Sequence, residues 1–223
     1  MDRNNSKSYV GLILILGAVW GLSETALGMG LRSCASLVSG SLMTGVALFF
    51  IASSWVVSRR ILAVALLLVI TAIFKMFDAV LLSLPLRHGA IANPIFAFFM
   101  ECAAFLVLVI IIKETLKQKK LGQALLGGAS AIIAVSLFPL VKFATGIPAC
   151  VFPGTSIPLS ICFAPLAIAL SIVTVPLGFW AGEKFKAALS RIKTANRKKA
   201  LRYIVSPATL ALSLAIIALI RLI

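Results

Sequence analysis

Acidic residues are scarce in this chain of 223 residues, which has 6 Asp and Glu residues against 21 Lys and Arg residues. The chain also has one histidine and four cysteines without CxxC spacing, and it contains neither an HExxH motif nor a GxxxxGK[ST] loop. These absences argue against a zinc centre, a metalloprotease and a P-loop ATPase. The apolar spans also lack the Ser and His pair of a serine-type intramembrane protease. We therefore expect no catalytic residue, no metal site and no cofactor, and predict that the chain is not an enzyme.

Apolar residues, by contrast, dominate the chain. They make up 61% of the sequence, the mean hydropathy is +1.13, and runs of about twenty apolar residues recur. This pattern predicts an all-α, polytopic integral membrane protein embedded in a lipid bilayer. A net charge of +15 would suggest nucleic acid in a soluble protein. Here the basic residues lie between the apolar runs, so we predict no nucleic-acid partner and interpret them as topology signals.

The apolar runs predict seven transmembrane helices, which cover residues 9–31, 35–57, 61–84, 93–112, 121–143, 159–182 and 203–220. We expect Pro94 to mark the start of the fourth helix and Pro139 to kink the fifth. Residues 145–158 have three prolines, two glycines and no charge, which predicts a structured external loop that shields a cavity. We divide the chain into a six-helix core (1–182), a basic cytoplasmic amphipathic segment (183–202) and a C-terminal transmembrane helix (203–223).

Basic residues predict the orientation of these helices. With the N-terminus in the cytoplasm, the internal segments are the leader and residues 58–60, 113–120 and 183–202, which together hold 16 of the 21 Lys and Arg residues. The external side then holds Arg32, Arg87 and Arg221. The positive-inside rule therefore predicts a cytoplasmic N-terminus and an external C-terminus, and we expect the inner membrane of a prokaryote.

Charged residues inside the predicted helices form a second pattern. In the predicted orientation, Glu24, Lys75, Asp78, Glu101 and Lys142 all fall in the middle or outer half of the membrane. Lys75 and Asp78 are three residues apart and can pair on one helical face, which leaves Glu24 and Glu101 to share Lys142 or a ligand. Because isolated charges are costly at this depth, the cluster indicates a polar cavity that opens outward. Two other interpretations stay open: Lys142 reaches the outer interface, and Lys75 with Asp78 is a purely structural pair.

Two uncharged residues complete the predicted ligand site. Trp20 lies one turn before Glu24, and Asn93 lies at the outer start of the fourth helix. The predicted ligand-binding residues are therefore Glu24, Lys75, Asp78, Glu101, Trp20, Asn93 and Lys142. We interpret His88, in the outer loop, as a surface residue, although it could close over a ligand. Cys34 and Cys150 both fall on the outer side, where a disulfide is chemically permitted; we favour unpaired thiols.

The first helix carries a face of small residues. Gly17, Gly21, Glu24 and Gly28 are spaced 4, 3 and 4 residues apart, so they share one side of an α-helix. This face allows another helix to approach closely, and we predict that Gly17, Gly21 and Gly28 dock a partner or pack tightly. In the alternative interpretation, Glu24 is a structural hydrogen-bonding group on a packing helix.

Residues 9–182 resemble the substrate-binding S components of energy-coupling-factor (ECF) transporters, in which about six apolar helices surround an outward-facing pocket. The Gly17-xxx-Gly21 pattern, with Ala18 and Ala26, is similar to the AxxxA-type pattern with which S components dock a transmembrane coupling protein. The resemblance implies uptake of a small, vitamin-like solute and an ATPase-driven partner. The excess of one acid over the bases in the predicted cluster, by contrast, favours a cationic or hydrogen-bond-donating ligand. The seventh helix departs from the family, and no vitamin-specific signature is present.

Three other functions stay open from the residues alone. In an ion- or proton-coupled secondary transporter, Glu24, Asp78 or Glu101 would take up a proton or cation. In a non-catalytic assembly protein, the same charges would hold a partner helix. A membrane enzyme that acts on lipid is the third alternative.

Overall fold

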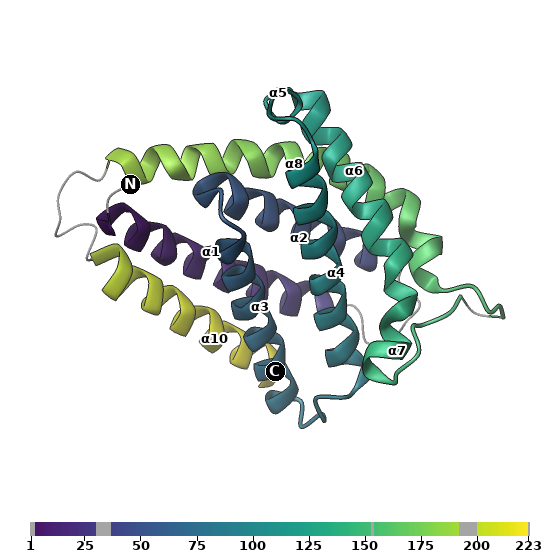
Figure 1. The fold of residues 1–223 in the computed structure, drawn as a ribbon. Helices are drawn as coiled ribbons and strands as arrows, with labels where there is room; N and C mark the ends of the chain where they lie inside the picture. Colours follow the sequence, from purple (N-terminus) through teal and green to yellow (C-terminus); the bar gives the residue numbers. More distant parts are fainter. Residues whose placement is uncertain (1–2, 30–36, 153, 192–199, 223) are drawn as a thin grey trace.

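The structure is a computed structural model, which describes residues 3–29, 37–152, 154–191 and 200–222. The helices follow one another as α1 (Arg3–Met29), α2 (Leu37–Ser58), α3 (Ile61–Leu81), α4 (Gly89–Ile111), α5 (Glu114–Lys117), α6 (Lys120–Leu137), the 3₁₀ helix η1 (Phe138–Leu140), α7 (Val141–Thr145), α8 (Leu159–Arg191), the π-helical turn η2 (Leu201–Val205) and α10 (Ser206–Leu222) (Figure 1). Among the described residues, the only β structure is an isolated antiparallel bridge between Val151 and Pro158.

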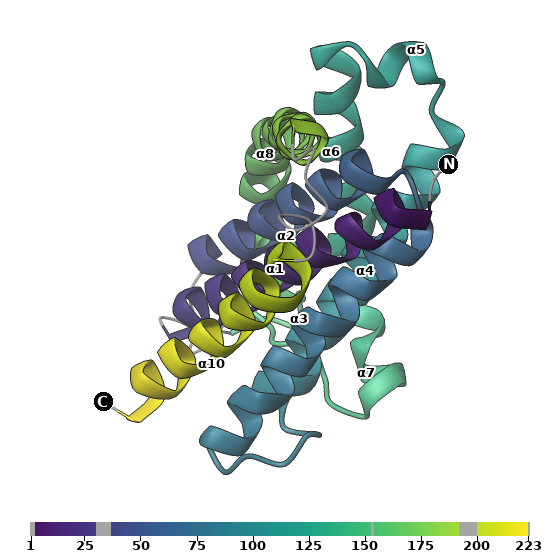
Figure 2. The ribbon, with the colours of Figure 1, turned by 90° about the vertical axis from the view of Figure 1, so that its left-hand side faces the viewer.

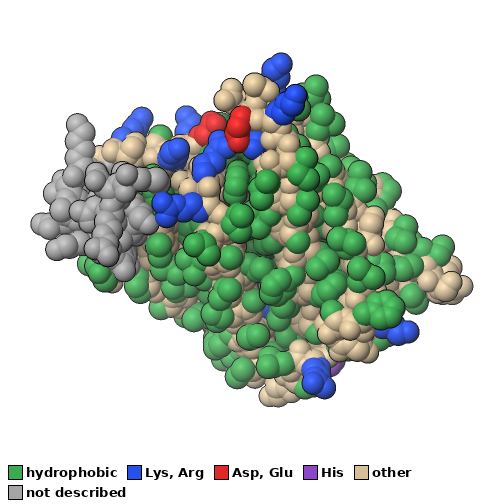
Figure 3. Space-filling model, viewed as in Figure 1, with side chains coloured by type: hydrophobic (Ala, Val, Ile, Leu, Met, Phe, Trp, Pro, Cys, Tyr) green, Lys and Arg blue, Asp and Glu red, His purple; other side chains and the backbone are tan. Residues whose placement is uncertain are grey.

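Seven helices in the described ranges are long and apolar enough to cross a bilayer. They confirm the predicted fold class, and the chain is an all-α, polytopic membrane protein. The flank of the molecule in Figure 3 is largely apolar, as a lipid-facing surface requires. Most of the Lys and Arg side chains visible on this face gather toward the end that carries α5.

Two prolines are predicted to mark helix boundaries or kinks, and the structure bears out one of them. Pro139 lies in η1, where the α-helical backbone of α6 gives way to a 3₁₀ turn, so the predicted irregularity is confirmed. The predicted start of the fourth helix at Pro94 is wrong, because α4 begins at Gly89 and Pro94 lies inside it. His88 caps this start: its Nδ1 atom accepts a hydrogen bond from the Ala90 amide at 3.2 Å.

Helix α8 is longer than predicted. It runs without interruption from Leu159 to Arg191, a length of about 50 Å at 1.5 Å per residue, whereas the hydrocarbon layer is about 30 Å thick. The predicted boundary at Gly182 is therefore not a helix end. Residues 192–199 of the predicted amphipathic segment lie outside the described residues.

Helix α8 packs tightly on α2 as far as Gly182, and beyond it Leu189 is still buried in the hydrophobic core. An added Cβ atom at Gly178 would lie 2.6 Å from the Phe49 carbonyl oxygen, and one at Gly182 would lie 2.7 Å from Cβ of Val56. The Ser53 hydroxyl also donates a hydrogen bond to the Gly178 carbonyl at 3.1 Å. Small residues therefore bring these two backbones together up to Gly182, where the predicted apolar run ends.

The glycine face of α1 is covered by α3 of the same chain. An added Cβ atom at Gly21 would lie 2.5 Å from Cγ of Phe74, and one at Gly17 would lie 2.8 Å from Cγ2 of Ile70. Figure 2 shows α1 running between α2 and α3, with α10 alongside. Close approach along this face is confirmed, but the role of Gly17 and Gly21 in docking another protein is corrected, because α3 already occupies the face.

The seventh spanning helix, α10, is an integral part of the bundle. Ile217 is fully buried in a cluster with Ile70 and Phe74 of α3. At the other end of α10, the Ser206 hydroxyl donates a hydrogen bond to the Gly11 carbonyl of α1 at 2.9 Å. Two of the helices that carry the predicted charge cluster, α1 and α3, are thus held in place partly by α10.

Candidate ligand-binding cavity

A cavity of about 800 Å³ lies between the ends of the spanning helices that are far from α5. In the described part of the chain every spanning helix contributes to its wall, including Glu24 of α1, Thr44 of α2, Asp78 of α3, Glu101 of α4, Val135 of α6, Phe163 of α8 and Arg221 of α10. This volume is within the range of small-molecule sites in proteins. Since seven helices meet here, the cavity is a product of the whole bundle.

The cavity collects most of the predicted charge cluster. Glu24, Lys75, Asp78 and Glu101 all line it, and they come from three different helices, α1, α3 and α4. Each side chain is buried, and Asp78 is fully buried. Ionisable groups at such depth are normally functional or compensated by partners. The four residues therefore need to be considered with their neighbours.

Asp78 is the hub of an ion-pair network. The predicted pair with Lys75 is confirmed, since Nζ of Lys75 lies 3.2 Å from Oδ2 of Asp78. Arg221 of α10 also binds Asp78, with Nη2 2.7 Å from Oδ2 and Nε bonded to Oδ1. Two oxygens facing two guanidinium nitrogens form the bidentate geometry of a strong pair. Sequence reasoning missed Arg221 as a site residue, although its predicted position at the outer end of the last helix placed it at the right level.

Glu24 and Glu101 reach the cavity from α1 and α4, and neither forms an ion pair with a described residue. Oε2 of Glu24 is buried and lacks a hydrogen-bond partner within the described ranges. The cavity thus holds three carboxylates and two basic side chains, which is the predicted balance. The second base is Arg221, which binds Asp78, and not Lys142, the residue predicted to pair with Glu24 and Glu101.

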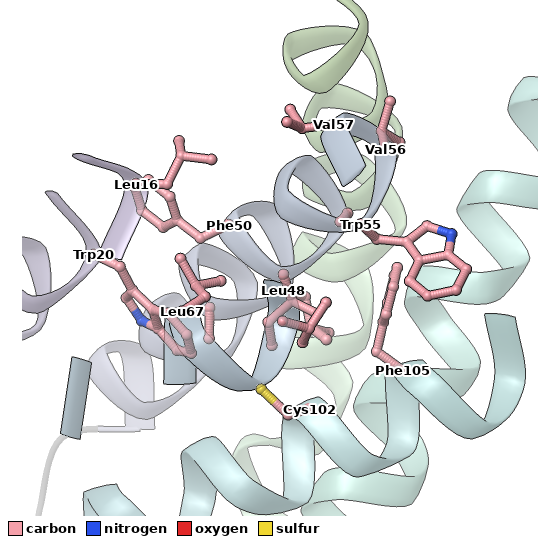
Figure 4. Close-up of a cluster of buried hydrophobic side chains, with 14 of the residues drawn as sticks. Leu16, Trp20, Leu48, Phe50, Trp55, Val56, Val57, Leu67, Cys102 and Phe105 are labelled. Atoms are coloured by element: carbon pink, nitrogen blue, oxygen red, sulfur yellow. The ribbon is translucent and has the colours of Figure 1, made fainter. Parts of the chain in front are cut away.

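Two predicted ligand-binding residues are not part of the wall. The side chain of Lys142, on α7, is exposed and is not among the lining residues. Trp20 is fully buried in the hydrophobic core, near Leu67 (Figure 4). The centroid of its ring lies 6.4 Å from that of Phe50, on which it stacks, and 5.3 Å from that of Phe98, a lining residue. Trp20 is therefore not a lining residue, but it packs against one.

Uncharged polar groups also line the cavity. Asn93 does so as predicted, and its Oδ1 atom is buried without a hydrogen-bond partner among the described residues. Ser160, at the start of α8, also lines the cavity, and its hydroxyl is likewise buried without a hydrogen-bond partner among the described residues. The sequence did not single out Ser160, because serine is common in membrane helices. Gly28 faces the cavity too: an added Cβ atom there would lie 3.7 Å from Nζ of Lys75, at ordinary contact distance. Unlike Gly17 and Gly21, Gly28 is therefore a lining residue.

The loop of residues 145–158 closes one side of the cavity, as predicted. Ile147, Pro148 and Cys150 line it. Gly146 ends α7 with φ of 76°, a left-handed conformation that turns the chain back toward the helices. Cys150 is disulfide-bonded, so the expectation of an unpaired thiol at this position is corrected. Cys34, the cysteine considered as its partner, lies outside the described residues.

His88 has a dual position, since it caps α4 and also lines the cavity. Across the described ranges, no three His, Cys, Asp or Glu side chains converge in a way that could hold a metal ion.

Comparisons with known proteins found no family model, no curated protein and no solved structure that matches this chain. The cavity itself is therefore the basis for an assignment of function.

Proposed function

We propose that this protein is a membrane transport component that binds a small solute from the extracytoplasmic side for uptake. The observation that carries the proposal is the cavity, which is formed by all seven spanning helices in the described chain and lined by buried charges. Buried charges stabilise a fold poorly compared with apolar replacements. Their concentration around one cavity of ligand size is better explained by binding than by stability.

The side of the membrane follows from charge. The cavity lies at the helix ends opposite α5 and the basic linkers. Because basic segments stay in the cytoplasm, the cavity would face outward and the C-terminus would be external. A C-terminal reporter that is active only in the cytoplasm should be silent in cells, whereas an active reporter would contradict this orientation.

Within this class, we favour a role like that of an ECF S component, in which an ATPase-driven partner supplies the energy. The chain contains no P-loop, and its apolar helices surround a cavity of about 800 Å³. Because α3 covers Gly17 and Gly21, the coupling partner would have to dock on another surface of the bundle. Co-purification with an ATPase pair would support this role.

An ion- or proton-coupled carrier is the second candidate, and it is favoured by Glu24 and Glu101. Both are buried carboxylates without an ion pair in the described structure, and both face the cavity. Such groups can take up a proton or a cation during transport. Uptake that fails on ATP depletion but tolerates an uncoupler would favour the ECF-like role, and the reverse would favour the carrier.

The binding function can be tested by filling the cavity. Ala97 lines it from α4, so Ala97→Trp should occupy the volume available to a solute. Ala103 lies on the same helix but is exposed on its outer face, which makes Ala103→Trp a matched control. Mass spectrometry of gently purified protein should detect small molecules retained by wild type and by Ala103→Trp, and none retained by Ala97→Trp. Equal retention by all three proteins would show that this cavity is not the site.

A further inference from the structure

The distribution of charge in the cavity indicates what kind of solute fits it. Both basic residues of the wall are bound to Asp78, which has Lys75 on one side and the guanidinium of Arg221 on the other. Glu24 and Glu101 have no such partner among the described residues. Three carboxylates against two bases leave the wall with one excess negative charge when all five groups are ionised.

Unused hydrogen-bonding atoms add a second, independent observation. Oε2 of Glu24, Oδ1 of Asn93 and Oγ of Ser160 are buried and have no hydrogen-bond partner within the described ranges. They come from three different helices and belong to the same cavity wall. The Glu24 and Ser160 side chains are only 2% and 1% exposed, so bulk water does not solvate them. A carboxylate and an amide oxygen only accept hydrogen bonds, so Glu24 and Asn93 both lack a donor, and the Ser160 hydroxyl can accept a hydrogen bond from a donor as well as give one.

The rest of the wall is mainly apolar and partly aromatic. Phe98, Phe138 and Phe163 line the cavity from α4, η1 and α8. Aromatic faces attract cations and also pack against the apolar part of a ligand. An amphipathic molecule with one charged end would match both parts of this wall.

We propose that the solute is an organic cation, with a protonated amine or related nitrogen held by Glu101 and Glu24 and an apolar body held by the phenylalanines. This inference rests on the proposed binding function and specifies its ligand class. The nitrogen supplies hydrogen-bond donors to the unused acceptors and neutralises the excess negative charge.

An anionic solute fits this arrangement less well. Lys75 and Arg221 already neutralise part of the acidic wall through Asp78, and an anion bound beside them would place four negative charges against two positive ones. Uncompensated negative charge in a poorly solvated site therefore opposes the binding of an anion.

The test uses three probes with the same apolar body: 2-phenylethylammonium, 2-phenylethanol and 3-phenylpropanoate. Their binding to the full chain in lipid nanodiscs is measured by calorimetry, with wild type, Glu101→Gln, Glu24→Gln and Glu114→Gln compared. Glu114 lies in α5, far from the cavity lining, and provides the control for removal of an acid elsewhere. Thermal unfolding of each variant without probe checks that the fold is kept.

We expect the ammonium probe to bind more tightly than the other two, and Glu101→Gln to weaken it about tenfold or more, as loss of a charge-assisted hydrogen bond predicts. Glu24→Gln should act in the same direction, and Glu114→Gln should have no effect. Preference for the carboxylate or the alcohol, or an unchanged affinity for the ammonium in both cavity variants, would overturn the cation assignment. If wild type retains a neutral or anionic molecule on purification, the cation assignment fails while the binding function stands. If nothing is retained and no probe binds, both fail.

Discussion

Arg221 and Asp78 join the C-terminal end of α10 to α3 through a bidentate pair, in which Nη2 of Arg221 lies 2.7 Å from Oδ2 of Asp78. The two residues are 143 positions apart in the sequence, and both side chains are buried. Because Ser206 holds the other end of α10 on α1, the last helix is fastened at both ends. The pair therefore links α10 to α3, and both of its residues form part of the cavity wall.

A double-mutant cycle measures the interaction free energy between Arg221 and Asp78. Arg221→Met leaves Asp78 with one basic partner, and Asp78→Leu leaves two basic residues without an acid. Each should destabilise the protein, by up to about 3–5 kcal/mol for a buried pair that loses one member. The double variant should cost less than the sum of the two. Reversible unfolding in mixed micelles is the measurement.

The surface pair between Arg59 and Glu114 is the control for this cycle. Its atoms are 3.3 Å apart, and the two side chains are 45% and 65% exposed. Arg59→Met should therefore change the free energy of unfolding by about 1 kcal/mol or less. Strict additivity of Arg221→Met and Asp78→Leu would show that the two residues do not interact in the membrane.

Lys75→Met should be milder than Asp78→Leu. From the local sequence, Lys75 would be the single neutralising partner of Asp78, and its loss would strand the acid. In the structure Asp78 keeps the guanidinium of Arg221, so the charge stays compensated. The midpoints of thermal unfolding of the two variants provide the comparison. Equal destabilisation would indicate that Lys75 and Arg221 are both required by Asp78.

Gly21→Ala should destabilise the packing of α1 on α3, whereas Gly28→Ala should be tolerated. An added Cβ atom at Gly21 would lie 2.5–2.7 Å from Cβ, Cγ and Cδ1 of Phe74, close to the rigid base of that ring. At Gly28 the nearest atom would be Nζ of Lys75 at 3.7 Å. We expect a cost of about 1–3 kcal/mol at Gly21, as for other overpacked sites. Similar stability of the two variants would contradict the close contact between α1 and α3.

The short helix α5 provides a pH-dependent prediction outside the membrane. The hydrogen bond from Lys117 lowers the pKa of Glu114 below its ordinary value of 4.5, and the charges of Lys117 and Arg59 act in the same direction. A lowered folded-state pKa means that the ionised carboxylate stabilises the fold above the ordinary value and loses this contribution as pH falls through the folded value. The effect should be small because Glu114 is exposed.

Thermal stability of wild type and Glu114→Gln should therefore differ slightly at neutral pH and converge as the pH drops well below 4.5. A difference that stays constant down to acidic pH would show that the charge of Glu114 does not contribute.

Local physics made much of this protein predictable from its sequence. Each apolar run of about twenty residues is driven into the bilayer by its own transfer free energy, so the seven spans could be identified without knowledge of their neighbours. Helical periodicity put Gly17 and Gly21 on one face and allowed Lys75 to pair with Asp78. The cost of buried charge similarly pointed to Glu24 and Glu101 as residues that face protein or water.

Only the tertiary structure decided which groups meet. The sequence does not specify whether another protein or α3 covers the glycine face. In the structure α3 covers it, because Ile70 and Phe74 fit against Gly17 and Gly21. Trp20 is buried behind the wall and Lys142 is exposed, although both fell near the expected level of the cavity. Arg221 reaches Asp78 because α10 packs beside α3. Helix periodicity and hydropathy describe each helix alone, whereas these contacts depend on the rotation and neighbours of every helix, which are set by side-chain packing across the whole bundle.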